Sequence, residues 1–324
     1  MTPLARMSLV VSALMLPQGA ALAQDFPSKP IRAISSQGPG GLSDVFMRAL
    51  ADVLGTELGT TVVVENRTGA MGSIGARSCA ESPPDGYTIC IVPGEAVAIN
   101  PLIYQNTGFD PKTGLAPVTR AFYLTQVFAV NAALNVKSLN ELVALAKTKP
   151  EIMNYMAPSL SKVAFMRQFN NDHGTDFDRV PFKGGGDAVN NMLSGTTPVA
   201  IFGIGNLMQY IRAGKVTSLV VDGEQRSPLV PEVPTFREVG YSDHGWAAFF
   251  GIYAPAGTPK PIVDKINKAI AKVASVPEWQ QRHMIARGLQ PVLDSPEQFA
   301  AALEKDREQG LKVVKGSGLH PDVK

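Results

Sequence analysis

The sequence predicts an α/β protein with two doubly wound sheets. Short apolar, β-branched runs alternate along the chain with segments whose apolar residues recur at helical spacing, which is typical of parallel strands connected by helices. The chain has 324 residues, of which 45% are apolar and 18% charged, so each of two domains can bury a core. Neither a repeat nor a low-complexity linker interrupts the alternation.

The first 23 residues are expected to be separate from the fold. Arg6 precedes an apolar stretch over 7–16, Pro17 follows it, and the small residues at 21–23 provide a cleavage site. The apolar stretch is about half of the ~20 residues that a membrane-spanning helix requires. We therefore expect a cleaved signal peptide at 1–23 and an exported protein, with an uncleaved N-terminal anchor as the alternative.

The predicted elements of the first third begin with a short apolar strand. Ser43 and Asp44 can cap the helix that follows, and Gly59 ends it. The β-branched run TVVVE predicts the next strand. The expected order is a strand at 30–35, a helix to 59, a strand at 61–65, a glycine-spaced helix start at 69–75, a turn at 83–86 and a strand at 87–92.

The rest of the chain continues the alternation. Ser138 and Glu141 form a capping box, Gly195 stops a helix, and Pro296 takes the first position of the last helix. The expected strands are 127–131, 180–182, 199–202, 218–221 and 251–255, with a short segment at 154–156, and the expected helices include one from about 161, one after the glycines at 184–186, one ending at 213–214, 259–273, 277–287 and one from 296 onward.

Two cysteines, Cys79 and Cys90, lie in a predicted helix and in the strand that follows it. An exported protein reaches a compartment that permits disulfides. Either the two side chains form a bridge across a helix–strand contact, or both are small buried apolar residues. Their spacing does not suit zinc.

Charge and motifs exclude several function classes. The formal net charge is +2, from 30 basic and 28 acidic residues spread along the chain, so no nucleic-acid partner is expected. The four histidines are scattered without an H-x-x-x-H pair, and no G-x-S-x-G elbow occurs, so we expect neither a metal site nor catalytic residues. No cofactor is expected, because no P-loop or Rossmann fingerprint is present.

Three strand-to-helix turns are rich in glycine, at 37–44, 69–75 and 184–186. Glycine lets an anion approach the free amides of a helix N-terminus, and ligands of open α/β sheets collect at the carboxyl ends of the strands. Any one of these turns alone is better explained as a tight turn without a ligand. The three together favour a site for a small anion.

Nine stretches, taken in order, resemble the Bug family, which supplies the periplasmic substrate-binding component of tripartite tricarboxylate transporters. The resemblance runs from about residue 26 to the C-terminal helix. The stretches are FPSKPIR (26–32), PGG-x-x-D (39–44), VVVENR-x-GAMGSIGA (62–76), PPDGYT (83–88), AINPLIY (98–104), FKGG (182–185), IRAGKV (211–216), RSPLVPEVPTF (226–236) and GIYAPAGTPKPIV (251–263).

The resemblance implies a type II periplasmic-binding-protein fold, in which a ligand cleft lies between two lobes joined by two crossovers. It implies that 24–125 begin lobe 1, that 126–248 form lobe 2, that 249–324 complete lobe 1, and that the crossovers lie near 122–127 and 245–251. Such a protein captures a small organic carboxylate and delivers it to the membrane subunits of the transporter, and we expect a monomer. The alternatives are a receptor for a membrane sensor protein and, from another class, a secreted hydrolase or lyase.

In the family, backbone amides and ordered water at the first strand–helix loop hold a ligand carboxylate, and the opposite lobe contributes hydroxyls. Carried over, these regions are 36–44, 157–161 and 183–187. Glu95 stands where the family usually has a small polar residue, and it either contacts a ligand amine or hydroxyl or points to solvent. The implied ligand-binding residues are Ser36, Gln37, Gly40, Gly41, Ser43, Asp44, Glu95, Ser159, Ser161, Lys183, Gly184 and Asp187.

Other departures from the family pattern bear on the ligand. Ser36 and Gln37 stand where the family usually has Pro-Phe, and the loop at 157–162 is shortened and lacks a histidine. Lys162 and Lys183 are the charged candidates for a second carboxylate. Because glutamine replaces an aromatic residue, the sequence favours an aliphatic di- or hydroxycarboxylate over a benzoate-like acid.

Overall fold

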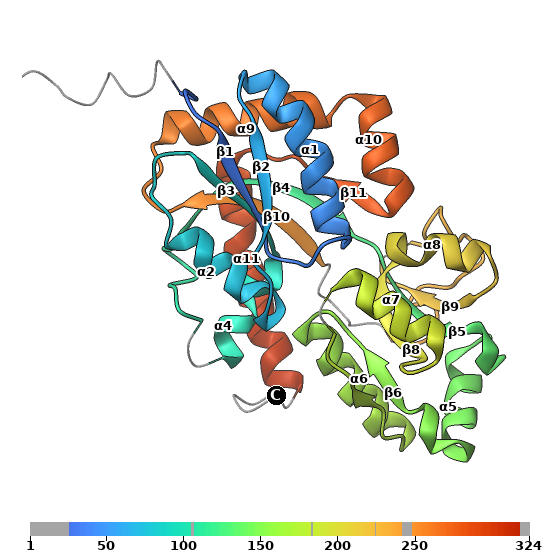
Figure 1. Ribbon diagram of the computed structural model, residues 1–324. Helices are drawn as coiled ribbons and strands as arrows, with labels where there is room; N and C mark the ends of the chain where they lie inside the picture. Colours follow the sequence, from blue (N-terminus) through green and yellow to red (C-terminus); the bar gives the residue numbers. More distant parts are fainter. Residues whose placement is uncertain (1–25, 105–106, 183, 224, 242–247, 318–324) are drawn as a thin grey trace, which may run out of the picture.

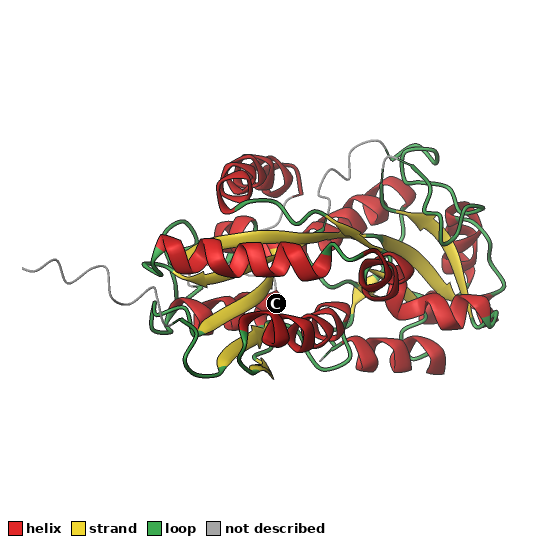
Figure 2. Cartoon of the chain, turned by 90° about the horizontal axis from the view of Figure 1, so that it is seen from above, coloured by secondary structure: helices red, strands yellow, loops and turns green. Residues whose placement is uncertain are grey.

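The structure is a computed structural model that describes residues 26–317, apart from 105–106, 183, 224 and 242–247. This part of the chain forms two α/β lobes, each built on one sheet with helices on both faces (Figure 1, Figure 2). The predicted pair of doubly wound sheets is confirmed. The predicted signal peptide at 1–23 lies outside the described residues.

Lobe 1 is built on a six-stranded sheet with the order β11-β4-β10-β3-β1-β2. Its strand β3 is buried on both faces, because Ile89 and Ile91 join one apolar cluster while Cys90 and Val92 join another. Helices α1 and α9 cover the first face, and α2 and α11 cover the second. The elements are β1 (Ile31–Ser35), α1 (Leu42–Leu58), β2 (Val62–Asn66), α2 (Ser73–Ala80), β3 (Thr88–Pro93), α3 (Gly94–Ala98), α4 (Asn100–Ile103), β4 (Leu115–Leu124), β10 (Phe249–Pro255), α9 (Lys260–Ala274), α10 (Pro277–His283), β11 (Leu289–Pro291) and α11 (Pro296–Ser317).

Lobe 2 is built on a five-stranded sheet with the order β7-β6-β8-β5-β9. Strand β5 alternates in the same way, with Phe128 and Val130 on the side of α5 and α6, and Val127 and Ala129 on the side of α7 and α8. The elements are β5 (Gln126–Asn131), α5 (Leu139–Thr148), β6 (Asn154–Met156), α6 (Leu160–His173), β7 (Asp178–Arg179), α7 (Gly185–Ser194), β8 (Val199–Gly203), α8 (Ile204–Arg212) and β9 (Val216–Val221).

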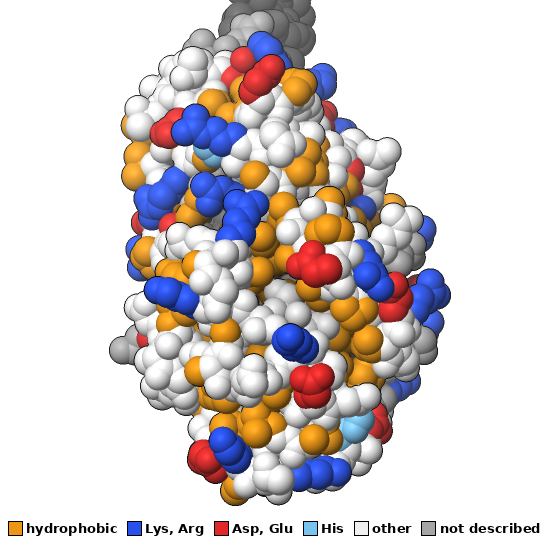
Figure 3. Space-filling model, turned by 90° about the vertical axis from the view of Figure 1, so that its right-hand side faces the viewer, with side chains coloured by type: hydrophobic (Ala, Val, Ile, Leu, Met, Phe, Trp, Pro, Cys, Tyr) orange, Lys and Arg blue, Asp and Glu red, His pale blue; other side chains and the backbone are white. Residues whose placement is uncertain are grey.

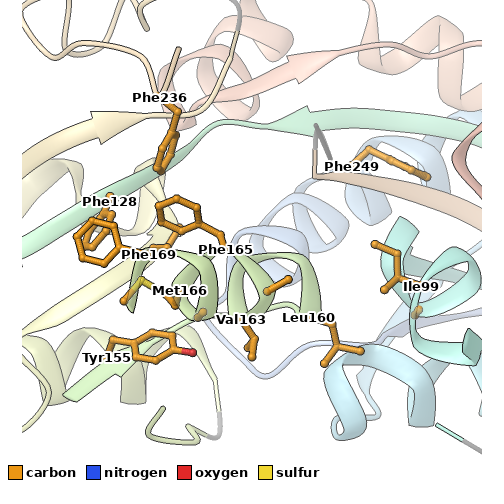
Figure 4. Close-up of a cluster of buried hydrophobic side chains, with 14 of the residues drawn as sticks. Ile99, Phe128, Tyr155, Leu160, Val163, Phe165, Met166, Phe169, Phe236 and Phe249 are labelled. Atoms are coloured by element: carbon orange, nitrogen blue, oxygen red, sulfur yellow. The ribbon is translucent and has the colours of Figure 1, made fainter. Parts of the chain in front are cut away.

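One apolar cluster continues from lobe 2 into lobe 1. It extends from Phe128 and Tyr155 along helix α6, through Leu160, to Ile99 and Phe249 of lobe 1 (Figure 4). Helix α6 also packs against α11. The two lobes therefore share buried apolar surface in addition to the strands that connect them.

The sheets are mixed, whereas the sequence pattern predicted parallel ones. Strand β10 is antiparallel to β3 and β4, and β5 is antiparallel to β8 and β9. Each of these two strands brings the chain into a lobe from the other lobe, so its first residues lie at the space between the lobes. Strands β1, β3 and β8 instead end at that space, and therefore run in the opposite direction.

Three strands differ from the sequence-based expectation. The strand expected at 180–182 is instead the two-residue strand Asp178–Arg179, because Pro181 has no N–H to contribute to a ladder. Strand Leu115–Leu124 was not expected, since a proline and an arginine interrupt its apolar pattern, and neither was the three-residue strand Leu289–Pro291. The shift to Asp178–Arg179 affects the site, as described below.

Lys and Arg as well as Asp and Glu side chains lie on the face that carries α8 and α10, with apolar side chains between them (Figure 3). Within residues 26–317, leaving aside the gaps, no helix has both the length and the hydropathy needed to cross a bilayer.

Cys79 of α2 and Cys90 of β3 form a disulfide, with their Cα atoms 6.1 Å apart. Both side chains are fully buried between the helix and the sheet. Of the two alternatives that the sequence left open, the bridge is therefore the one found.

Replacing both cysteines by alanine is expected to lower the free energy of unfolding by about 2–3 kcal/mol, because the bridge closes a short loop, with a sequence separation of 11, in the unfolded chain. Urea unfolding of the Cys79→Ala/Cys90→Ala variant measures the change, and Ser78→Ala in the same helix is the control. An unchanged midpoint and slope would contradict the expected contribution.

Candidate ligand-binding cleft

A cavity of about 580 Å³ lies between the two lobes. Its lobe 1 wall comes from the loop after β1, the loop before α2 and the end of β4. Its lobe 2 wall comes from the segment after β7, the start of α7 and the end of β8. Most of these segments follow the carboxyl ends of strands, the position at which α/β sheets bind ligands.

The first loop of lobe 1 holds its shape through polar side chains. The Asp44 carboxylate is buried and accepts hydrogen bonds from the Gly40 amide at 3.0 Å and from Asn66 Nδ2 at 2.7 Å. Ser43 Oγ donates to Gln37 Oε1 at 3.1 Å, and the Gly41 amide donates to the Gly38 carbonyl oxygen at 3.2 Å. The amides of Gly40 and Gly41, expected to face a ligand, thus donate within the loop.

Two polar residues at the start of this loop lie at the cavity wall. Ser36 and Gln37 both line it, and the buried Ser36 Oγ has no hydrogen-bond partner in the described structure. Asp44 and Ser43 do not line it, so their role is to shape the loop. Of the residues predicted for lobe 1, therefore, Ser36, Gln37 and Gly41 lie at the cavity wall.

The glycine loops of the two lobes touch across the cleft. A Cβ atom added to Gly185 would lie 3.1 Å from Cα of Gly41, and one added to Gly184 would lie 3.5 Å from Cα of Gly38. Gly184 lines the cavity, whereas Asp187 is exposed on α7 and does not. Lys183 lies outside the described residues.

Glu95 is buried, so the alternative in which it points to solvent is wrong. It lies in the first turn of α3 and is 4% exposed. Its carboxylate accepts hydrogen bonds from the Ser161 amide, at 3.2 Å, and from Ser161 Oγ. Burial raises the pKa of Glu95, and the hydrogen bonds from Ser161 partly oppose this rise. The pair joins lobe 1 to the N-terminus of α6 in lobe 2.

Glu95 and Ser159 line a second, smaller cavity of about 40 Å³. It is a continuation of the main cavity, because both share wall residues from the two lobes. The shared residues are Gln37, Met71, Leu124, Pro158 and Phe250.

Lys162 does not face the cleft, which corrects its prediction as a charged candidate for a ligand carboxylate. Its side chain is 2% exposed, and Nζ forms an ion pair with Asp222 at 2.9 Å. Both residues belong to lobe 2. The expectation failed because a lysine at a helix start was assumed to project from the loop, whereas here it is directed into the interior of the lobe.

Arg179 is the charged residue that the sequence did not reveal. Among the described residues that line the main cavity, it is the only one with a charged side chain. Nη2 donates to the Ala157 carbonyl oxygen at 3.4 Å, and the buried Nε has no hydrogen-bond partner in the described structure. A guanidinium without an acidic partner among the described lining residues is suited to a carboxylate. The signal that could have found it is its position at the end of a strand.

Aromatic side chains also line the main cavity. Tyr104, Phe182, Phe202 and Phe250 contribute to its walls. An apolar wall is therefore present although Gln37 stands where the family usually has an aromatic residue. The described lining residues combine these apolar sides with the cation of Arg179.

The family model of the tripartite tricarboxylate transporter family receptor matches residues 46–319. Among solved structures, the periplasmic binding protein BugD is 28% identical, with a TM-score of 0.83 over 91% of this chain and 99% of that one. The protein Rpa4515 of R. palustris with adipate is 27% identical, with a TM-score of 0.84 over 91% and 99% of the two chains. MatC from Rhodopseudomonas palustris with bound malate is 25% identical, with a TM-score of 0.81 over 89% and 100%.

These similarities extend over both lobes. They confirm the type II periplasmic-binding-protein fold and the resemblance to Bug proteins, which the motifs had indicated. The cavity between the lobes is consistent with a receptor of that kind. The chain therefore belongs to the tripartite tricarboxylate transporter receptor family.

Proposed function

We propose that this protein is an exported receptor that captures a small organic carboxylate between its lobes and delivers it to the membrane subunits of a tripartite tricarboxylate transporter. The observation that carries the proposal is the guanidinium of Arg179 in the wall of the interlobe cavity, without an acidic partner among the described lining residues. Two relatives of the same fold were solved with adipate and with malate, both small carboxylates.

The proposed ligand site combines both lobes. From lobe 1 it uses Ser36, Gln37 and Gly41, and from lobe 2 Arg179 and Gly184. A volume of about 580 Å³ is ample for a small acid together with bridging water. The aromatic walls suit the carbon skeleton, so an aromatic acid belongs in any ligand screen beside the aliphatic acids that the sequence favours.

We further propose that the site binds without chemical conversion. The described residues of the main cavity wall include hydroxyl groups but no histidine, cysteine, aspartate or glutamate that could act as a general base beside them. In the proposed organisation, 1–23 are removed on export, 24–125 and 249–324 form lobe 1, 126–248 form lobe 2, and the receptor acts as a monomer.

A thermal-shift screen of mono-, di-, hydroxy- and aromatic carboxylic acids tests the proposal. An acid that binds only the native state stabilises it by about 2.7 kcal/mol at a free concentration 100-fold above Kd, so its unfolding temperature should rise. The matching neutral amide of each acid is the control, because it lacks the charge that Arg179 recognises. A screen in which no acid stabilises the protein more than its amide would contradict a carboxylate receptor.

A further inference from the structure

The small cavity of about 40 Å³ that adjoins the main cavity has acceptors on its wall. We infer that it is a subsite for a hydrogen-bond donor of the ligand, an ammonium or a hydroxyl group, and that Glu95 closes it to a second carboxylate. This inference rests on the proposed function, since it takes Arg179 to hold the carboxylate of the same ligand. It assigns the substrate class as small amino- or hydroxycarboxylates.

The chain itself already occupies the anion site at the N-terminus of α6. Helix α6 has 14 residues, and its free N-terminal amides attract an anion. The carboxylate of Glu95 accepts from the amide and the hydroxyl of Ser161, in the first turn of this helix. A ligand carboxylate placed here would lose those donors to Glu95 and would meet a like charge.

The wall of the same cavity contains an acceptor without a hydrogen-bond partner in the described structure. Gln126, the first residue of β5, is 1% exposed and lines the cavity with Glu95 and Ser159. Its Oε1 atom has no hydrogen-bond partner in the described structure. A buried amide oxygen without a donor destabilises its site, so a group that donates to it gains affinity. The volume admits one or two small polar groups and no more.

The cation nearest to Glu95 in the first turn of α6 is paired with another carboxylate. Lys162 is the neighbouring cation, but its Nζ is already paired with Asp222 at 2.9 Å. Glu95 itself is only 4% exposed, and burial raises its pKa. An ammonium group would supply the missing positive charge, and a hydroxyl group would supply a neutral donor.

One ligand can reach both ends, because the two cavities adjoin. Arg179 lines the main cavity and Glu95 lines the small one, and the two cavities share five wall residues from both lobes. A ligand that extends from one cavity into the other can therefore place a carboxylate at Arg179 and a donor at Glu95.

The test compares ligands that differ only at one end. Calorimetric titration is carried out with hexanoate, 6-aminohexanoate, 6-hydroxyhexanoate and adipate, and with the corresponding four-carbon series. We expect the amino or the hydroxy acid to bind at least about tenfold more tightly than the dicarboxylate of the same length, a difference of about 1.4 kcal/mol. Whichever of the amino and the hydroxy acid binds more tightly identifies the donor group. A dicarboxylate that binds as tightly as both would overturn the inference and leave the receptor assignment intact.

If no member of either series binds, but neutral solutes do, the proposed function itself has failed. In the variant Glu95→Gln, the ratio between the Kd of the dicarboxylate and the Kd of the aminocarboxylate of the same length should fall at least about tenfold. Glu81→Gln, at the exposed end of α2, is the control. The variant Gln126→Met keeps the volume and removes the acceptor. It should weaken the amino and hydroxy acids but not hexanoate, and equal losses for all ligands would contradict the subsite. The selectivity of the unmodified protein decides the matter even if Glu95→Gln does not fold.

Discussion

Replacing Arg179 by methionine is expected to weaken the binding of a small carboxylate about 10- to 100-fold. A hydrogen bond to a charged group contributes about 1.5–3 kcal/mol, and each 1.4 kcal/mol changes Kd tenfold. Arg179 is the only charged side chain among the described residues of the main cavity wall, so none of them can substitute for it. Methionine preserves much of the apolar stem, which isolates the loss of the charge.

Calorimetric titration with the acid that gives the largest thermal shift measures this loss. The control is Arg212→Met, an exposed arginine of the same lobe at the end of α8 and away from the cavity. Arg179→Lys should recover part of the affinity, because it restores the charge without the planar fork. Unchanged affinity in a folded Arg179→Met variant would show that the ligand carboxylate is held elsewhere in the cleft.

The order of strands and helices could be predicted because local signals mark it. Ser138 caps α5 as expected, its hydroxyl accepting from the Glu141 amide at 3.2 Å, and Gly59 and Gly195 end their helices in the left-handed conformation. Strand direction could not be predicted in the same way, because the pairing of β10 with β3 and β4 joins residues far apart in the chain. Likewise, the bridge between Cys79 and Cys90 depends on how α2 packs on β3.

The sequence could indicate those parts of the candidate site that local glycine-rich turns form. The loop at 36–44 lies at the cavity as the glycine pattern indicated, because a glycine-rich turn after a strand is a local feature. The contact between Glu95 and Ser161 joins positions 66 residues apart, and no spacing in the sequence reports it. Arg179 was missed because the strand expected at 180–182 lies two residues earlier, which moves this arginine from before the strand to its end.

Leucine at position 185 is expected to hold the lobes apart and so to weaken ligand binding by about tenfold or more. Gly185 lies in the first turn of α7, where even a Cβ atom would be 3.1 Å from Cα of Gly41 in the opposite lobe. A larger side chain in such a contact costs about 1–3 kcal/mol, and the lobes can avoid this cost by opening. Apparent affinity then falls with the fraction of molecules that can still close.

The neighbouring glycine provides a matched control for this steric prediction. A Cβ atom added to Gly186 meets no atom within 4 Å, although Gly186 lies in the same helical turn. Gly186→Leu should therefore retain the affinity of the unmodified protein, and its radius of gyration in small-angle scattering with saturating ligand should be unchanged. Gly185→Leu should show weaker binding and a larger radius in the same experiments, with a normal unfolding transition. If the two variants bind equally well and are equally compact, the glycine loops do not have to meet for the ligand to be held, and the contact between Gly41 and Gly185 carries no part of the affinity.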